Sequence, residues 1–187
     1  MRYEITAPKK FDATITLPAS KSISNRALVI HALSYGNIMP RHLSDCDDTE
    51  VMVNALRDMP DTIDIKAAGT AMRFLTAYLS VAEGEEHVIT GTERMKHRPI
   101  AILVDALRYL GADISYEGEE GYPPLRIKGK ALEGGHLEIT GSVSSQYISA
   151  LLMIGPALKN GLELKMTGNI ASRPYIDLTL WMMREFG

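Results

Sequence analysis

The sequence predicts an α/β (α+β) protein built from repeated βαβαββ units. Segments with apolar residues at helical spacing alternate with short strand-like segments, and the order of elements starts again partway along the chain. The chain has 187 residues, 45% of them hydrophobic, which is enough to bury a core without a disulfide or a metal. We expect one globular domain or two small ones, in units of about 65–75 residues.

Apolar spacing and capping residues predict six helices. Ile23, Ala27 and Ile30 share one face of the first helix. The fourth has Pro99 in its first turn and Gly111 at its end, the usual positions of these residue types. The expected helices cover about residues 22–33, 47–59, 71–81, 99–111, 144–158 and 174–187.

Short strands are expected before and between the helices. Their residue types and alternation are typical of half-buried strands. No tract rich in glycine, serine or proline divides the chain, so we expect no internal linker. The expected strands cover residues 13–17, 62–67, 87–90, 113–116, 125–128, 136–139 and 163–167.

The composition excludes several classes of protein. Lys and Arg number 20 against 23 Asp and Glu, a net charge of −3, which argues against a dedicated nucleic-acid binder. Cys46 is the only cysteine, and the five histidines have no ligand spacing, so we expect no disulfide framework and no metal site. The N-terminus resembles no targeting peptide and no apolar run approaches a membrane span, which predicts a cytoplasmic protein.

Basic residues gather at the expected helix openings. A helix N-terminus carries partial positive charge and favours acids, so cations there cost stability unless an anion binds to both. The pattern therefore predicts anion sites. The residues concerned are Lys21, Arg26, Arg73, Arg94, Lys96, Arg98 and Arg173.

Small polar donors accompany these cations, and Gly69 leaves its backbone open to a ligand. Each donor taken singly is more often an ordinary cap, and residues 45–48 (DCDD) are more often a capping acidic opening than a metal site. We expect Cys46 to be a packed or partly exposed thiol whose acidic neighbours raise its pKa. The joint pattern predicts a ligand with several anionic groups. The donors are Ser22, Ser24, Thr70, Ser142, Ser144, Ser145, Gln146 and Ser172.

Five segments resemble, in the same order, signatures of the 5-enolpyruvylshikimate-3-phosphate synthase family. Each is weak alone, but together they are specific and cover the chain from about residue 8 to its end. They are residues 18–28 (PASKSISNRAL), 68–73 (AGTAMR), 94–100 (RMKHRPI), 141–146 (GSVSSQ) and 172–177 (SRPYID).

The resemblance implies the enolpyruvyl transferase fold, in which two globular halves of three βαβαββ units close over the substrates. Residues 1–11 would then belong to the absent second half. Residues 12–187 would form the substrate-binding half, about two and a half units truncated at the C-terminal end. The implied reaction moves the enolpyruvyl group of phosphoenolpyruvate to the 5-hydroxyl of shikimate 3-phosphate and releases phosphate, with no metal or organic cofactor.

The resemblance also assigns roles to particular residues. Lys21 would be catalytic and would touch both substrates, since a compact cation stabilises developing charge or relays a proton. The shikimate 3-phosphate site would hold Lys21, Ser22, Arg26, Ser144, Ser145, Gln146, Ser172 and Tyr175. The phosphoenolpyruvate site would hold Lys21, Gly69, Arg98 and Gln146.

The chain departs from the family pattern in several places. Ala67 and Phe74 stand where relatives often carry Asn and Pro, and Cys46 stands where Ser is common. Gly69 is kept, which implies room for phosphoenolpyruvate-like inhibitors such as glyphosate. The family chain is more than twice as long and monomeric, so we expect these 187 residues to bind shikimate 3-phosphate weakly and to turn nothing over. An uncovered sheet edge favours self-association of the fragment.

Two other interpretations are compatible with parts of the sequence. The sister enolpyruvyl transferase acting on a UDP-amino sugar shares the fold, but its first signature has Lys-Asn where this chain has Lys21-Ser22. The loop of its reactive cysteine also does not match Cys46. The second alternative is a non-catalytic anion- or RNA-binding α/β module, whose binding would be unselective and strongly salt-dependent.

Overall fold

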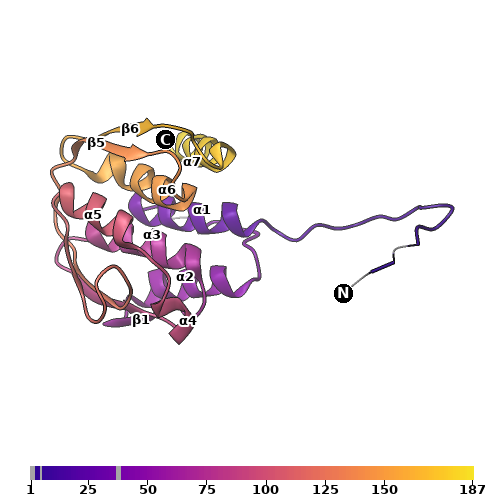
Figure 1. The fold of residues 1–187 in the computed structure, drawn as a ribbon, viewed down its shortest axis with the longest axis horizontal. Coiled ribbons are helices and arrows are strands. Elements are labelled where there is room, and N and C mark those ends of the chain that lie inside the picture. Colours follow the sequence, from indigo (N-terminus) through magenta and orange to yellow (C-terminus); the bar gives the residue numbers. More distant parts are fainter. Residues whose placement is uncertain (1–2, 5, 37–38) are drawn as a thin grey trace.

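The computed structural model describes residues 3–4, 6–36 and 39–187. Figure 1 shows a body of helices with strands on two sides of it. The helices are α1 (Lys21–Leu33), α2 (Asp47–Asp58), α3 (Gly69–Ser80), α4 (Glu93–Lys96), α5 (Ala101–Tyr109), α6 (Ser145–Ile154) and α7 (Arg173–Glu185), with a 3₁₀ turn over Gly155–Ala157. The strands are β1 (Thr62–Asp64), β2 (Glu86–Thr90), β3 (Asp113–Tyr116), β4 (Leu125–Lys128), β5 (Gly135–Thr140) and β6 (Leu162–Thr167).

The sheets confirm the repeated unit. β1 and β2 are parallel and α3 connects them, while β4 lies antiparallel to both β2 and β3, giving the order β1-β2-β4-β3. β5 and β6 repeat the first half of this arrangement, since they are parallel and α6 connects them. The α/β fold of βαβαββ units is therefore confirmed, with one unit complete between β1 and β4.

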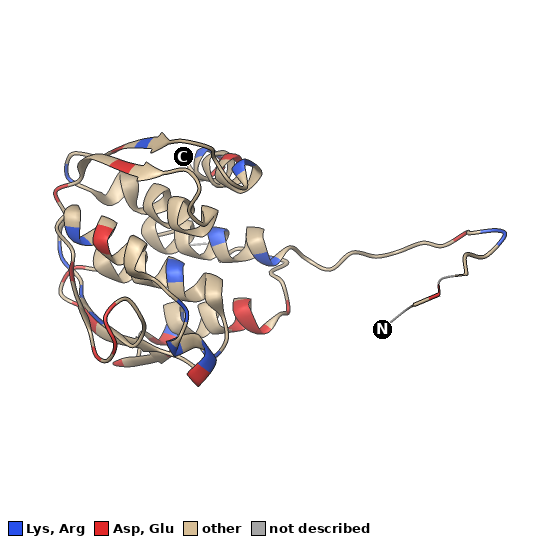
Figure 2. Ribbon diagram, viewed as in Figure 1, with Lys and Arg blue, Asp and Glu red and all other residues tan. Residues whose placement is uncertain are grey.

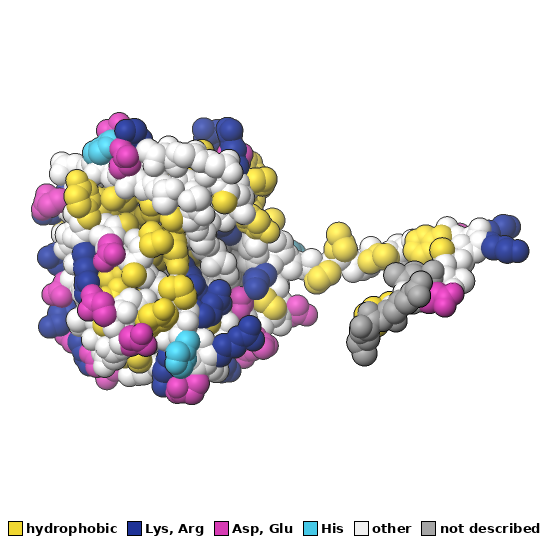
Figure 3. All heavy atoms as spheres, in the orientation of Figure 1, with side chains coloured by type: hydrophobic (Ala, Val, Ile, Leu, Met, Phe, Trp, Pro, Cys, Tyr) yellow, Lys and Arg dark blue, Asp and Glu magenta, His cyan; other side chains and the backbone are white. Residues whose placement is uncertain are grey.

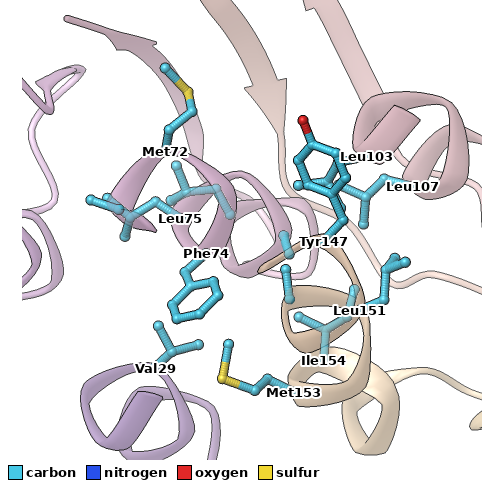
Figure 4. Close-up of a cluster of buried hydrophobic side chains, with 14 of the residues drawn as sticks. Val29, Met72, Phe74, Leu75, Leu103, Leu107, Tyr147, Leu151, Met153 and Ile154 are labelled. Atoms are coloured by element: carbon cyan, nitrogen blue, oxygen red, sulfur yellow. The ribbon is translucent and has the colours of Figure 1, made fainter. Parts of the chain in front are cut away.

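The core lies between the helices rather than within one sheet. Nearly every residue of α3 is buried, because α1, α5 and α6 all pack around this helix. Figure 4 shows Phe74 of α3 facing Val29 of α1 and Met153 of α6. A helix that is buried on nearly all sides lies in the middle of a packed body, and this central helix carries the second of the family-like segments at its opening.

The expected strand over residues 13–17 is wrong. These residues are extended but pair with no strand of the described chain, and they lie on an arm that leaves the body before α1 (Figure 1). Its apolar side chains are exposed, as Figure 3 shows, with Ile15 at 71% and Leu17 at 81%. Alternation gives a segment the side chains of a strand, but a strand also needs a partner backbone. The domain division at residues 11 and 12 stays a prediction.

The other differences are local. The sequence pattern missed α4, which spans four residues and is too short to show a periodicity. The second helix is capped by Cys46 and begins at Asp47, the expected first residue, and it ends where Met59 adopts a left-handed conformation ahead of Pro60. None of the described helices has the length and apolarity needed to span a bilayer.

Candidate functional site

The opening of α1 presents Lys21 half-exposed to solvent. Ser20 caps the helix, its hydroxyl accepting from the backbone N–H of Ile23 at 3.4 Å. The first turn contains no acid. Instead, the ammonium nitrogen of Lys21 lies 2.8 Å from a carboxylate oxygen of Asp48, at the opening of α2. This hydrogen bond raises the pKa of Lys21, so the side chain stays cationic at the helix end that least favours a cation.

Arg26 lies one turn further along α1 and is buried, with 2% of its surface exposed. Its guanidinium donates to the hydroxyl of Thr179 at 2.7 Å, to the hydroxyl of Ser149 at 2.9 Å and to the carbonyl of Ser22 at 2.9 Å. Burial lowers the pKa of Arg26 to about 10. No described carboxylate pairs with it, so this cation joins α1, α6 and α7 through neutral partners.

Two aromatic rings complete the surroundings of Arg26. Its guanidinium carbon lies 5.2 Å from the ring centre of Phe74 and 5.7 Å from that of Tyr175, within the range of a cation–π contact. Phe74, one of the departures from the family pattern, thus packs in the core against Arg26. Tyr175 is 47% exposed, so one ring connects the buried cation to solvent.

The opening of α3 brings Gly69 and Arg98 together. A Cβ placed on Gly69 would lie 2.9 Å from the guanidinium carbon of Arg98, so the glycine is what admits this side chain. Arg73 supports the arrangement from inside by donating to the carbonyl of Gly69 at 3.0 Å and to that of Pro99 at 3.3 Å. Burial lowers the pKa of Arg73, and proximity to Arg98 acts in the same direction. Two guanidinium groups therefore lie near one helix opening.

The opening of α6 contacts the opening of α3 through Gln146, whose side-chain amide donates to the hydroxyl of Thr70 at 3.2 Å. Ser144 caps the helix by accepting from the backbone of Gln146 at 3.3 Å, and Ser145 is buried. Ser172 caps α7 in a left-handed conformation without a side-chain bond to the helix. The predicted residues thus lie at the openings of α1, α3, α6 and α7, where Gly69 lies against Arg98 and Arg26 lies near the ring of Tyr175.

The charges of this region are mostly basic, as Figure 2 shows at the openings of α1 and α3. Free backbone N–H groups, hydroxyl groups and guanidinium groups are the donors that bind phosphate and carboxylate oxygens. Groups of three or more His, Cys, Asp or Glu that could hold a metal are absent from the described residues. The arrangement is therefore suited to binding an anion through protein donors.

An apolar hollow of the described surface lies elsewhere. It measures about 880 Å³ and is lined by the C-terminal parts of α1, α3 and α7, including Leu33, Val81 and Phe186. Its lining is mainly apolar, with one Arg and one Glu. A cavity of this character does not suit a ligand with several negative charges, so we place the candidate site at the opposite ends of these helices.

Three residues of the site were not predicted as such: Asp48 contacts Lys21, and Ser149 and Thr179 bind Arg26. Arg73 and Thr70, which contact Gly69 and Gln146, were predicted as part of the basic and polar pattern at the helix openings but were not assigned to a substrate. Nothing local marks Ser149 or Thr179, because their roles depend on the packing of helices far apart in the sequence.

The expected pKa direction of Cys46 is wrong. The thiol is partly exposed, as expected. Burial raises its pKa and so does Asp48, but hydrogen bonds with Ser44 and Thr49 outweigh both and bring the pKa below its ordinary value. The prediction took into account only the acidic neighbours, which raise the pKa of Cys46. The folded chain adds hydrogen bonds with the hydroxyl groups of Ser44 and Thr49, which lower it.

We therefore expect Cys46 to react with iodoacetamide at a lower pH in the folded chain than in the unfolded one. The rate of alkylation follows the thiolate fraction, so its midpoint should move to higher pH when the chain is unfolded in urea. Ser44→Ala should raise the midpoint in the folded state, since it removes one partner. A midpoint that is the same in the folded and unfolded chains would contradict this assignment.

Comparisons with known proteins agree with the segments identified above. The family model described as EPSP synthase (3-phosphoshikimate 1-carboxyvinyltransferase) matches residues 5–63 and 59–187. A 3-phosphoshikimate 1-carboxyvinyltransferase of Bacteroides fragilis is 66% identical over all 187 residues, which cover 45% of that protein. One from Shewanella halifaxensis is 42% identical over 96% of this chain and 48% of its own length. The chain spans about half the length of these relatives.

A solved structure with the same family name also has the fold of this chain. The EPSP synthase from Acinetobacter baumannii superposes with a TM-score of 0.76 at 24% identity, over 92% of this chain and 44% of that one. At this identity the likeness concerns the fold alone. The family model and the sequence identity to the Bacteroides fragilis protein show the family as well as the fold. The chain therefore belongs to the EPSP synthase (3-phosphoshikimate 1-carboxyvinyltransferase) family.

Proposed function

We propose that this chain forms the shikimate 3-phosphate-binding half of a 3-phosphoshikimate 1-carboxyvinyltransferase. The complete enzyme transfers the enolpyruvyl group of phosphoenolpyruvate to the 5-hydroxyl of shikimate 3-phosphate and releases phosphate. The observation that carries this proposal is the opening of α3, where Gly69 admits Arg98 and Thr70 bonds to Gln146. Both substrates are anions, and the donors gathered there suit their oxygens.

In this proposal Lys21 is the catalytic cation and touches both substrates, since its ammonium group is half-exposed at the opening of α1. Arg98, Gly69 and Gln146 bind phosphoenolpyruvate, and Gly69 leaves room for glyphosate in the same place. The remaining contacts to shikimate 3-phosphate come from Ser22, Arg26, Ser144, Ser145, Gln146, Ser172 and Tyr175. Arg26 acts mainly through Tyr175 and Ser22, because it is buried itself.

The complete enzyme is a cytoplasmic monomer of the shikimate pathway and needs neither a metal nor an organic cofactor. The 187-residue chain alone binds shikimate 3-phosphate weakly and releases no phosphate, because it spans about half the length of its relatives. The outer edges of β5 and β6 pair with no strand of the described residues, which favours self-association of the fragment.

Calorimetric titration of the chain with shikimate 3-phosphate, inorganic phosphate and RNA tests this function. We expect selective binding of shikimate 3-phosphate and a dissociation constant about tenfold higher for Ser145→Ala, which removes a buried donor to a charged group. Ser115→Ala, on the exposed face of β3, is the control and should bind as the unchanged chain does. Equal binding of phosphate or RNA would favour the anion-binding module instead.

A further inference from the structure

Asp48 contacts the residue to which the proposed function assigns the chemistry. It lies in the first turn of α2, and its carboxylate accepts from the ammonium group of Lys21 at 2.8 Å. The Asp48 side chain is 17% exposed and that of Lys21 is 47% exposed, so the acid forms the sheltered side of the pair. We propose that Asp48 is a positioning residue for Lys21, fixing its ammonium group at the opening of α1. This inference rests on the proposed function.

Hydrogen bonds between α1 and the residues that flank Asp48 hold this part of the chain in its place. The backbone N–H of Ser44 donates to the hydroxyl of Ser24 at 2.9 Å, and the hydroxyl of Thr49 donates to the side-chain oxygen of Asn25 at 2.9 Å. Thr49 is 1% exposed and Asn25 is fully buried. These bonds lie on both sides of Asp48 and tie the start of α2 to α1. Asp48 is therefore held by the packing of two helices, whereas lysine has a flexible four-carbon stem.

The charge of Asp48 is also the one that α1 lacks. The first turn of α1 contains no acid, although its N-terminus carries partial positive charge and Lys21 adds a full one. Asp48 supplies the missing negative charge from the neighbouring helix. An ammonium group has three donors, of which Asp48 takes one, so two remain for the oxygens of a bound substrate.

Asp47 provides a matched comparison on the same turn of α2. Its side chain is exposed, and the described ion pairs include none that involves it. Asp47→Asn and Asp48→Asn remove the same formal charge from neighbouring positions. Any long-range effect of net charge on an anionic ligand is therefore shared by the two variants, and only Asp48→Asn changes the anchoring of Lys21.

The test is a double-mutant cycle read by calorimetry with shikimate 3-phosphate. We expect Asp48→Asn to raise the dissociation constant about fivefold relative to Asp47→Asn, and Asp48→Glu to restore part of the affinity. In a Lys21→Met chain the additional Asp48→Asn change should have no effect, because no ammonium group is left to position. Equal affinities of the two Asn variants, or the same loss in the Lys21→Met background, would overturn the proposal.

A second measurement separates this inference from the proposed function. Nitrogen-15 NMR of the lysine ammonium groups follows Lys21 directly, and the signal is assigned by its loss in Lys21→Met. Its titration midpoint should fall in Asp48→Asn and stay unchanged in Asp47→Asn. If the unchanged chain does not bind shikimate 3-phosphate, the proposed function fails. The anchoring is then judged by NMR alone, where an unchanged midpoint in Asp48→Asn overturns it.

Discussion

Arg26→Ala is expected to lower the free energy of unfolding by about 3–5 kcal/mol, the largest effect of any single substitution proposed for this chain. The change removes the donors to Thr179, Ser149 and the carbonyl of Ser22, and it leaves a cavity between two aromatic rings. Urea unfolding followed by circular dichroism would measure it, as a lower midpoint with an unchanged slope.

Two comparison variants show where the effect comes from. Arg26→Met keeps most of the volume and removes a charge whose burial is itself costly. Thr179 and Ser149 can still bond to each other, at 2.9 Å, so this variant should lose less than half as much as Arg26→Ala. Arg173→Ala, at an exposed arginine, should change stability by less than about 0.5 kcal/mol. If Arg26→Ala were as stable as Arg173→Ala, Arg26 would not hold the helices together.

Gly69→Ala is expected to change binding strongly and stability hardly at all. Alanine is favoured over glycine inside a helix, so the chain should keep its stability or gain up to about 1 kcal/mol. The new methyl group would meet the guanidinium of Arg98, the end of a flexible side chain that can move away. We therefore expect phosphoenolpyruvate and glyphosate to bind at least about tenfold more weakly, because Arg98 leaves its place at the opening of α3.

Gly118→Ala is the control for this substitution. A Cβ there would meet Pro124 only at ordinary contact distance, 3.8 Å, in the hairpin between β3 and β4. Thermal unfolding and titration with phosphoenolpyruvate should not distinguish this variant from the unchanged chain. If Gly69→Ala bound phosphoenolpyruvate as tightly as Gly118→Ala does, the contact between Gly69 and Arg98 would have no part in binding.

Much of the fold could be predicted from the sequence, because its determinants are local. The helix bounds at 21–33 and 47–58 lie within a residue or two of those expected from apolar spacing and caps. β3 and β4 were predicted to the residue. The arm over 13–17 shows the limit of this reasoning, since its alternation gives no information about whether a partner strand is present.

The residue types of the site could be predicted from the sequence, but the burial and the partners of each side chain could be predicted only in part. Gly69 and Arg98 were assigned to one ligand, and they are in contact. Arg26 was predicted as a ligand contact, yet it is buried, and its partners Thr179 and Ser149 lie 153 and 123 residues away in the sequence. A motif conveys which side chains are present at a helix opening. How deeply each is buried depends on helices that the motif does not include.

The distance along the chain between Arg26 and Thr179 also has a consequence for biosynthesis. A ribosome adds about 5–20 residues per second, so Thr179 is made roughly 8–30 s after Arg26. During that interval the nascent α1 carries a guanidinium group whose partners on α6 and α7 do not yet exist, beside an apolar face without its final cover. Helix α1 is thus among the last of the described helices to be fully covered, and until α7 is made its apolar face is the kind of exposed surface that is prone to aggregation.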